Sequence, residues 1–122
     1  MDPRVFLKNA NTILYCNKWP ETVAFYRDFL KLSITHKSDW FVEFQLVGTA
    51  HLSVAKAARA TIKSSLGAGI TLALQVEDAD EAWRQLAGFG LQLEPVRDHS
   101  WGARVFYLFD PEGHRIEIWS PA

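Results

Sequence analysis

The closing stretch Gly102–Pro121 places the strongest constraint on the fold of this 122-residue chain. It contains two runs rich in β-branched and aromatic residues, separated by Asp110-Pro111-Glu112-Gly113. Pro111 suits the second position of a turn because its φ is already fixed, and Gly113 supplies the permissive backbone that closes the turn. The sequence therefore predicts that the chain ends in an antiparallel hairpin.

The second run of this hairpin, His114–Trp119, alternates in character. Ile116 and Ile118 point to one face, and the opposite face carries Arg115, Glu117 and Trp119. If the isoleucines lie in the core, Glu117 is held in mid-strand on the other face, where a buried carboxylate is costly without a partner. A protein cation, a metal ion, a ligand donor or open water would each satisfy it.

The overall composition is that of an ordinary globular domain, with 48% hydrophobic and 22% charged residues. A chain of this length buries a real core without needing disulfides or a structural metal. The net charge of −1 gives no electrostatic signature of nucleic-acid or anionic-membrane binding, so we expect neither partner.

The single cysteine, Cys16, cannot form an internal disulfide, which favours a cytoplasmic location. Its place in the apolar run Ile13–Cys16 indicates a buried structural thiol rather than a nucleophile. The N-terminal residues do not resemble a signal peptide, and no stretch is apolar for the roughly 18 residues that a membrane span needs.

The first half of the chain predicts a strand, a helix and three further strands. The helix begins near Pro20, which suits a first turn, and its apolar face is formed by Trp19, Val23, Tyr26 and Leu30. The strands are expected at residues 12–16, 32–36, 40–47 and 50–55.

The same order of elements recurs after a small, polar connector. We expect a strand at 70–76, a helix that Asp78 caps together with Glu81, a strand at 91–96, a loop at 97–101 and the closing hairpin. An offset of 60 residues relates the two halves. The predicted fold class is α+β: one domain, 1–122, of two βαβββ modules, at about 10–56 and about 70–121, with a linker at about 57–69.

Several motifs in this repeated βαβββ order resemble a known superfamily. They are Phe25-Tyr26 with Phe29-Leu30, Val76–Ala82, Trp101-Gly102 and Phe109–Trp119. In order and spacing they resemble the vicinal oxygen chelate superfamily, which includes glyoxalase I, bleomycin-resistance proteins, fosfomycin-resistance enzymes and extradiol dioxygenases. The resemblance implies a U-shaped cleft lined by the sheets of both modules and usually completed in a homodimer.

The resemblance also indicates where a metal would bind. Carried over by position, the metal-ligand sites of the superfamily fall on Asn11, Ser53, Thr71 and Glu117, and a shift by two in the first module would include His51. One carboxylate, one amide and two hydroxyls are a poor ligand set for a divalent metal. We therefore expect no metal or other cofactor; Glu117 and His51 would be the ligands if one binds.

The same positions form the predicted ligand-binding site. Asn11, Tyr15, Thr71 and Gln75 are expected to face the pocket and to orient a small molecule by hydrogen bonds. The other predicted site residues are His51, Ser53, Trp101 and Glu117. The alternatives stay open: the polar residues are ordinary strand faces, Trp101 caps the core, and Glu117 pairs with Arg104, Arg115 or water. His99 and His114 are expected to be exposed loop residues.

No nucleophile–base pair and no phosphate-binding loop is present in the sequence. The first functional hypothesis is a metal-independent binding protein that sequesters a small aromatic or cationic ligand in a dimer cleft. The alternative is a metal-dependent lyase, isomerase or dioxygenase with a rearranged site that uses Glu117 and His51. A third possibility is an interaction module within a larger complex. Whether the protein is an enzyme stays open at this level.

Overall fold

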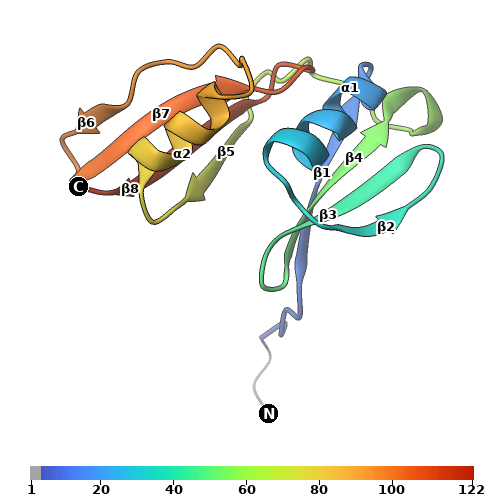
Figure 1. Ribbon diagram of the computed structural model, residues 1–122. Coiled ribbons are helices and arrows are strands. Elements are labelled where there is room, and N and C mark those ends of the chain that lie inside the picture. The colour runs from blue at the N-terminus through green and yellow to red at the C-terminus, as the bar shows by residue number, and fades with distance from the viewer. Residues whose placement is uncertain (1–3) are drawn as a thin grey trace. The chain divides into compact units, whose positions relative to one another are not determined.

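The computed structural model describes residues 4–122, which form two compact units, Met1–Ser64 and Ser65–Ala122. We call them unit 1 and unit 2. Each contains one four-stranded mixed sheet with a helix on one of its faces, as Figure 1 shows for each unit. None of the helices within residues 4–122 is long and apolar enough to cross a membrane.

The sheet of unit 1 has the strand order β1-β4-β3-β2. The first strand pairs in parallel with the last, and the other neighbours are antiparallel. Its strands are β1 (Ala10–Cys16), β2 (Ile34–Lys37), β3 (Phe41–Val47) and β4 (Ala50–Lys56), followed by the short 3₁₀ helix η2 (Ala57–Arg59).

The helix of unit 1 changes its winding halfway along. An α-helix, α1 (Trp19–Ala24), continues as the π-helical turn η1 (Phe25–Phe29), in which Leu30 N–H bonds to Phe25 C=O. In this wider turn the neighbouring residues Phe25 and Tyr26 are both buried, and the centres of their rings are 5.2 Å apart. The predicted apolar face is therefore confirmed at Val23 and Tyr26, and the π turn adds Phe25 to it.

Unit 2 repeats this arrangement with the strand order β5-β8-β7-β6 and a parallel β5–β8 pair. Asp78 caps its helix as predicted, because its Oδ1 accepts a hydrogen bond from Glu81 N–H at 3.2 Å. The predicted α+β class and repeated element order are confirmed. Its elements are β5 (Thr71–Gln75), α2 (Ala79–Ala87), β6 (Arg97–His99), β7 (Ala103–Phe109) and β8 (Arg115–Pro121).

The helices cover one face of each sheet, and that face carries the core. In unit 1 the fully buried side chains there are Leu14, Val42, Phe44, Leu52 and Val54. In unit 2 they are Phe106, Leu108, Ile116 and Ile118, and Ser120 Oγ accepts a hydrogen bond from the first residue of α2 at 3.0 Å. The predicted alternation in β8 is thus confirmed. We call the side of each sheet opposite its helix the helix-free face.

The strand predicted at 91–96 does not form. Pro95 has no N–H to give to a ladder, and the C=O of Glu94 is taken by the indole N–H of Trp83 at 2.9 Å. Residues 97–99, predicted as a loop, instead pair with β7 as β6. The segment that leaves the sheet borders a surface groove beside β7 that is lined by Gln92, Leu93, Glu94, Tyr107, Leu108 and Phe109.

The turn of the closing hairpin is organised by one buried carboxylate. Oδ1 of Asp110 accepts hydrogen bonds from the backbone N–H groups of Glu112, Gly113 and His114, each at 3.0 Å. Its Oδ2 lies 2.7 Å from Nδ1 of His114, whose side chain is 1% exposed. The expectation that His114 is an exposed loop residue is therefore wrong, because its ring completes the partners of Asp110.

The end of the connector also contacts this turn. Gly67 has φ +83°, and a side chain at this position would collide with the carbonyl group of Gly113. Gly113 itself has φ +104° and lies against the carbonyl of Leu66. Both positions therefore require glycine, for the positive φ and for the close approach of the two chain segments.

The two units carry opposite charge, which the net charge of the chain conceals. Residues 1–64 contain nine Lys or Arg and five Asp or Glu residues, whereas residues 65–122 contain four basic and nine acidic residues. Basic side chains are therefore scarce in unit 2, and the position of each one there is informative.

Replacing Asp110 tests the role of the buried carboxylate. The Asp110→Ala substitution leaves the backbone N–H groups of Glu112 and His114 and the His114 ring without their acceptor, whereas Gly113 N–H keeps the Asp110 carbonyl. We expect a loss of about 2 to 4 kcal/mol in the free energy of unfolding, measured by urea denaturation. Asp110→Asn, which keeps one acceptor oxygen, should lose less. The control Glu77→Ala, at an exposed position, should change the stability by about 0.5 kcal/mol or less. Equal stabilities for all variants would contradict this role.

Candidate functional site

In unit 1 the structure brings together two of the predicted site residues. Ser53 Oγ donates a hydrogen bond to Asn11 Oδ1 at 2.8 Å, and Asn11 Nδ2 donates to Glu43 Oε2 at 3.4 Å. Thr35 Oγ1 donates to the other oxygen of Glu43 at 2.7 Å. These four side chains form a continuous network across the helix-free face of unit 1, and its carboxylate and amide groups are largely satisfied within the protein.

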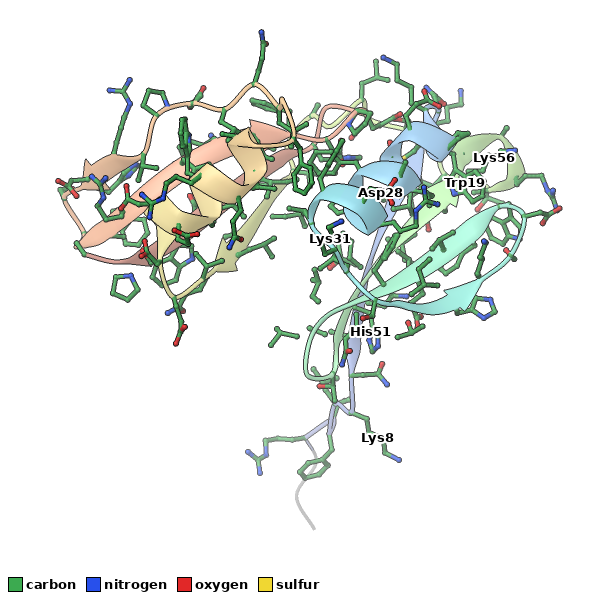
Figure 2. The ribbon with its side chains drawn as sticks, in the orientation of Figure 1. Lys8, Trp19, Asp28, Lys31, His51 and Lys56 are labelled. Atoms are coloured by element: carbon green, nitrogen blue, oxygen red, sulfur yellow. The ribbon has the colours of Figure 1, made fainter. Side chains whose placement is uncertain are left out.

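Tyr15 and His51 lie on the same face as this network. Tyr15 is half-buried at the far end of β1, where it is opposite Ala55. His51 is also half-buried and lies between Asn11 and Gln45 in the strand register. Figure 2 shows His51 towards the end of β4 that is opposite to Lys56. The two residues thus flank the network from opposite ends of the sheet.

In unit 2 the predicted residue Glu117 lies in mid-strand on β8, between Ala73 on β5 and Tyr107 on β7. It is half-buried, and within residues 4–122 no ion pair joins it to Arg104, which instead binds Asp80 and Asp98 at 2.7 and 3.2 Å. Burial, together with the charge of the Glu117 carboxylate and a hydrogen bond to it, raises the pKa of Tyr107. The phenol of Tyr107, which is opposite Glu117 in the strand register, is therefore the group whose pKa depends on this carboxylate.

Arg115 and Thr71 form a second polar pair on this face. The Nε–H of Arg115 donates to Thr71 Oγ1 at 3.0 Å, and the guanidinium carbon lies 4.8 Å from the centre of the Tyr107 ring. The hydroxyl therefore orients the arginine, and the aromatic ring supports its planar head.

Aromatic rings surround these polar groups on the helix-free face of unit 2. Trp101, predicted as a site residue, contacts the ring of Trp119 at 5.5 Å and that of His99 at 5.8 Å, and His99 lies 6.4 Å from Tyr107. Trp101 is 56% exposed, so it is not a core residue. Gln75 is exposed on β5 opposite Trp119. The face therefore combines edge-to-face aromatic contacts with a carboxylate, a guanidinium and an amide.

Sequence reasoning did not include several residues that the structure places in these sites. In unit 1 the residue that was missed is Glu43. It lies between the buried residues Val42 and Phe44, so the same period-two alternation that pointed to Glu117 could have found it. In unit 2 they are His99, Tyr107, Arg115 and Trp119. The alternation of the closing hairpin already placed Arg115 and Trp119 beside Glu117, whereas His99 depended on a strand that was predicted as a loop.

The donor atoms in the two sites do not fit a divalent metal ion. The Asn11 and Ser53 side chains bond to each other, and the Thr71 hydroxyl accepts from a guanidinium that places positive charge two residues from Glu117. No group of three His, Cys, Asp or Glu side chains in the described part of the chain is close enough to hold a metal. The chemistry of these donors is that of hydrogen bonding rather than metal coordination.

The strand registers of the two units make these sites equivalent. Ile13 of β1 is opposite Ser53, and Ala73 of β5, which is 60 residues later, is opposite Glu117. The profile of the Glyoxalase/Bleomycin resistance protein/Dioxygenase superfamily matches residues 9–118.

The chain belongs to this superfamily.

Solved structures share the vicinal oxygen chelate fold with this superfamily member. A glyoxalase/bleomycin resistance protein/dioxygenase from Nocardioides is 20% identical with a TM-score of 0.78, over 97% of this chain and 85% of that one. An antibiotic-binding protein from Streptomyces sp. CB03234 is 15% identical with a TM-score of 0.80, over 98% and 99%. A lactoylglutathione lyase from Agrobacterium tumefaciens is 20% identical with a TM-score of 0.76, over 98% and 96%. No curated protein sequence matches the chain significantly.

The contact between Tyr107 and Glu117 predicts a measurable titration. The raised pKa means that the folded protein favours the neutral phenol, so this contribution to stability is present below about pH 10 and is lost as the pH rises through the raised pKa. Glu117→Gln removes the negative charge, and we expect the pKa of Tyr107 to fall towards its ordinary value, followed by NMR of ¹³C-labelled tyrosine.

The Tyr107→Phe variant identifies the resonance, and the signals of Tyr15 and Tyr26 provide internal references. If Glu117→Gln leaves the titration of Tyr107 unchanged, the carboxylate is not its partner.

Proposed function

We propose that this superfamily member is a metal-independent binding protein that sequesters a small aromatic or cationic ligand. The observation that carries the proposal is the helix-free face of unit 2, where aromatic rings surround one half-buried carboxylate. Two of the rings, Trp101 and Trp119, contact each other edge to face. Exposed aromatic rings beside a few oriented polar groups are typical of sites for small organic molecules.

Glu117 supplies the polar specificity of the proposed site. The side chain opposite it on β7 is that of Tyr107, whose raised pKa favours the neutral phenol, and one phenol O–H can satisfy only one of the several lone pairs of a carboxylate. The remaining acceptor positions suit an N–H or O–H donor of a ligand, and Gln75 and Thr71 add hydrogen-bonding groups at the edge of the face. In unit 1, Asn11, Tyr15, His51 and Ser53 are proposed to form a ligand-binding surface of their own, which is polar and largely preformed.

The comparisons are compatible with both a binding role and a catalytic role. The similar structure from Streptomyces is that of an antibiotic-binding protein, so this fold is compatible with ligand capture. The similar lactoylglutathione lyase is named as an enzyme, and a metal-dependent lyase, isomerase or dioxygenase using Glu117 and His51 is the alternative function. The donor sets described above favour the first proposal, because they contain too few metal-binding groups.

We further propose that the protein acts as a cytoplasmic homodimer. The thiol of Cys16 is buried and forms no disulfide, which fits a reducing compartment, and the exposed apolar side chains Phe109 and Trp101 are surfaces that a partner or a ligand would cover. Light scattering of the purified protein should give twice the mass of the 13.9 kDa chain; the mass of a single chain would contradict the dimer.

Elemental analysis separates the binding protein from the metal enzyme. Untagged protein dialysed against zinc, nickel, manganese and iron should retain clearly less than one metal ion per chain. Retention of one ion per chain, lost in Glu117→Gln but kept in the control Glu77→Gln, would instead establish the metal-dependent alternative.

Removing one ring tests the aromatic face directly. A thermal-shift screen of small aromatic compounds should yield a ligand, and we expect Trp119→Ala to weaken its binding by about tenfold or more, which corresponds to about 1.4 kcal/mol. The control Trp83→Ala removes an indole on α2, on the other side of the same sheet, and should leave the affinity unchanged. Equal effects of the two variants would contradict the proposed site.

A further inference from the structure

Arg115 and Glu117 place opposite charges on the same face of β8, two residues apart. Residues i and i+2 of a strand project to the same side about 7 Å apart. Within residues 4–122 no ion pair joins these two side chains, although both lie on the face of β8 that also carries Trp119. The face therefore presents a separated cation and anion to anything that lies across it.

The position of Arg115 is set by neutral partners. Its Nε–H donates to Thr71 Oγ1 at 3.0 Å, and its guanidinium stacks over the Tyr107 ring at 4.8 Å. These contacts fix the plane of the head group. Its two terminal nitrogens form no hydrogen bond with a described residue, so four N–H donors of an oriented guanidinium are left for a ligand or water.

The charge balance of unit 2 makes this arrangement informative. Acidic residues outnumber basic ones by nine to four between residues 65 and 122, and both Arg84 and Arg104 are paired with carboxylates. Within residues 65–122, Arg97, which is exposed on β6, and Arg115 have no carboxylate partner, and of these two only Arg115 is oriented by a hydrogen bond to a neighbouring side chain. A planar guanidinium binds a carboxylate through two parallel hydrogen bonds, so an oriented but unpaired one suits an acidic ligand group.

We propose that the ligand of this face is a planar aromatic compound with a carboxylate that binds Arg115 and a hydrogen-bond donor that binds Glu117. Its ring stacks against Trp119 and Trp101. This inference rests on the proposed binding function. It selects an aromatic acid over a cationic ligand, because Arg115 repels a purely cationic ligand from the same face. Glu117 then discriminates among aromatic acids by accepting from a ring N–H or hydroxyl group.

Three probes with one ring system test this inference. Indole-3-acetate, tryptamine and indole-3-ethanol share the indole ring and its N–H donor and carry a negative, a positive and a neutral side chain. Isothermal titration calorimetry of the full chain should show that indole-3-acetate binds about tenfold more tightly than either of the others, as expected for one charge-assisted hydrogen-bonded pair.

Variants locate the preference on Arg115. Arg115→Gln should remove the preference for indole-3-acetate and leave the affinity for indole-3-ethanol within about twofold. Thr71→Val, which removes the hydroxyl that orients the guanidinium, should reduce the preference in part. The matched control Arg84→Gln makes the same chemical change on α2, on the other side of the sheet, and should keep the full preference. Thermal melting of each variant verifies that it is folded.

The outcomes separate this inference from the proposed function. Binding of all three probes with equal affinity, or tighter binding of tryptamine, overturns the acidic-ligand inference while the aromatic binding site stands. The same holds if Arg115→Gln and Arg84→Gln behave alike. If none of the probes binds, including the neutral one, both the inference and the aromatic binding function are overturned.

Discussion

The structure depends on the parallel pairing of the first and last strand in each unit. This pairing places β4 and β8 in the interior of their sheets, where one face is covered by a helix. Alternation then determines the role of every side chain on these strands. Ile116 and Ile118 are buried under α2 because they occupy one phase, and Glu117 is available for binding because it occupies the other. A slip of one residue would exchange the core and the site.

The features that followed from local patterns were predicted well from the sequence. Period-two alternation gave the faces of β8, the Asp78 cap gave the start of α2, and the repeated element order gave the α+β class. Features set by tertiary contacts were not predicted. The segment at 91–96 has a strand-like composition, but Pro95 and the hydrogen bond from Trp83 keep it out of the sheet. His114 is polar in sequence and is buried because Asp110 provides a partner that no local pattern reveals.

The two units use equivalent positions in different ways. In unit 1 the polar residues of the helix-free face bond to one another, and Ser53, Asn11 and Glu43 form a chain that is satisfied within the sheet. In unit 2 the charged groups of Arg115 and Glu117 on the corresponding face do not pair with each other, and aromatic side chains lie around them. The sequence indicated the positions of both sites through the resemblance to the superfamily. Their different character followed only when the cross-strand neighbours were known, since Glu43 and Tyr107 come from strands whose register the sequence did not define.

The contact between Gly67 and Gly113 determines where the chain tolerates alteration. The stretch at 57–69 has the composition of a flexible connector, which usually accepts insertions, tags and fragment boundaries. Its last residues are nevertheless held against the closing turn, and position 67 excludes every side chain. A fragment of unit 2 that begins at Ile70 would lack the backbone that covers this turn, whereas one that begins at Ser65 retains it. Engineered insertions therefore belong on the N-terminal side of Ser65, although the composition of the connector would place them several residues later.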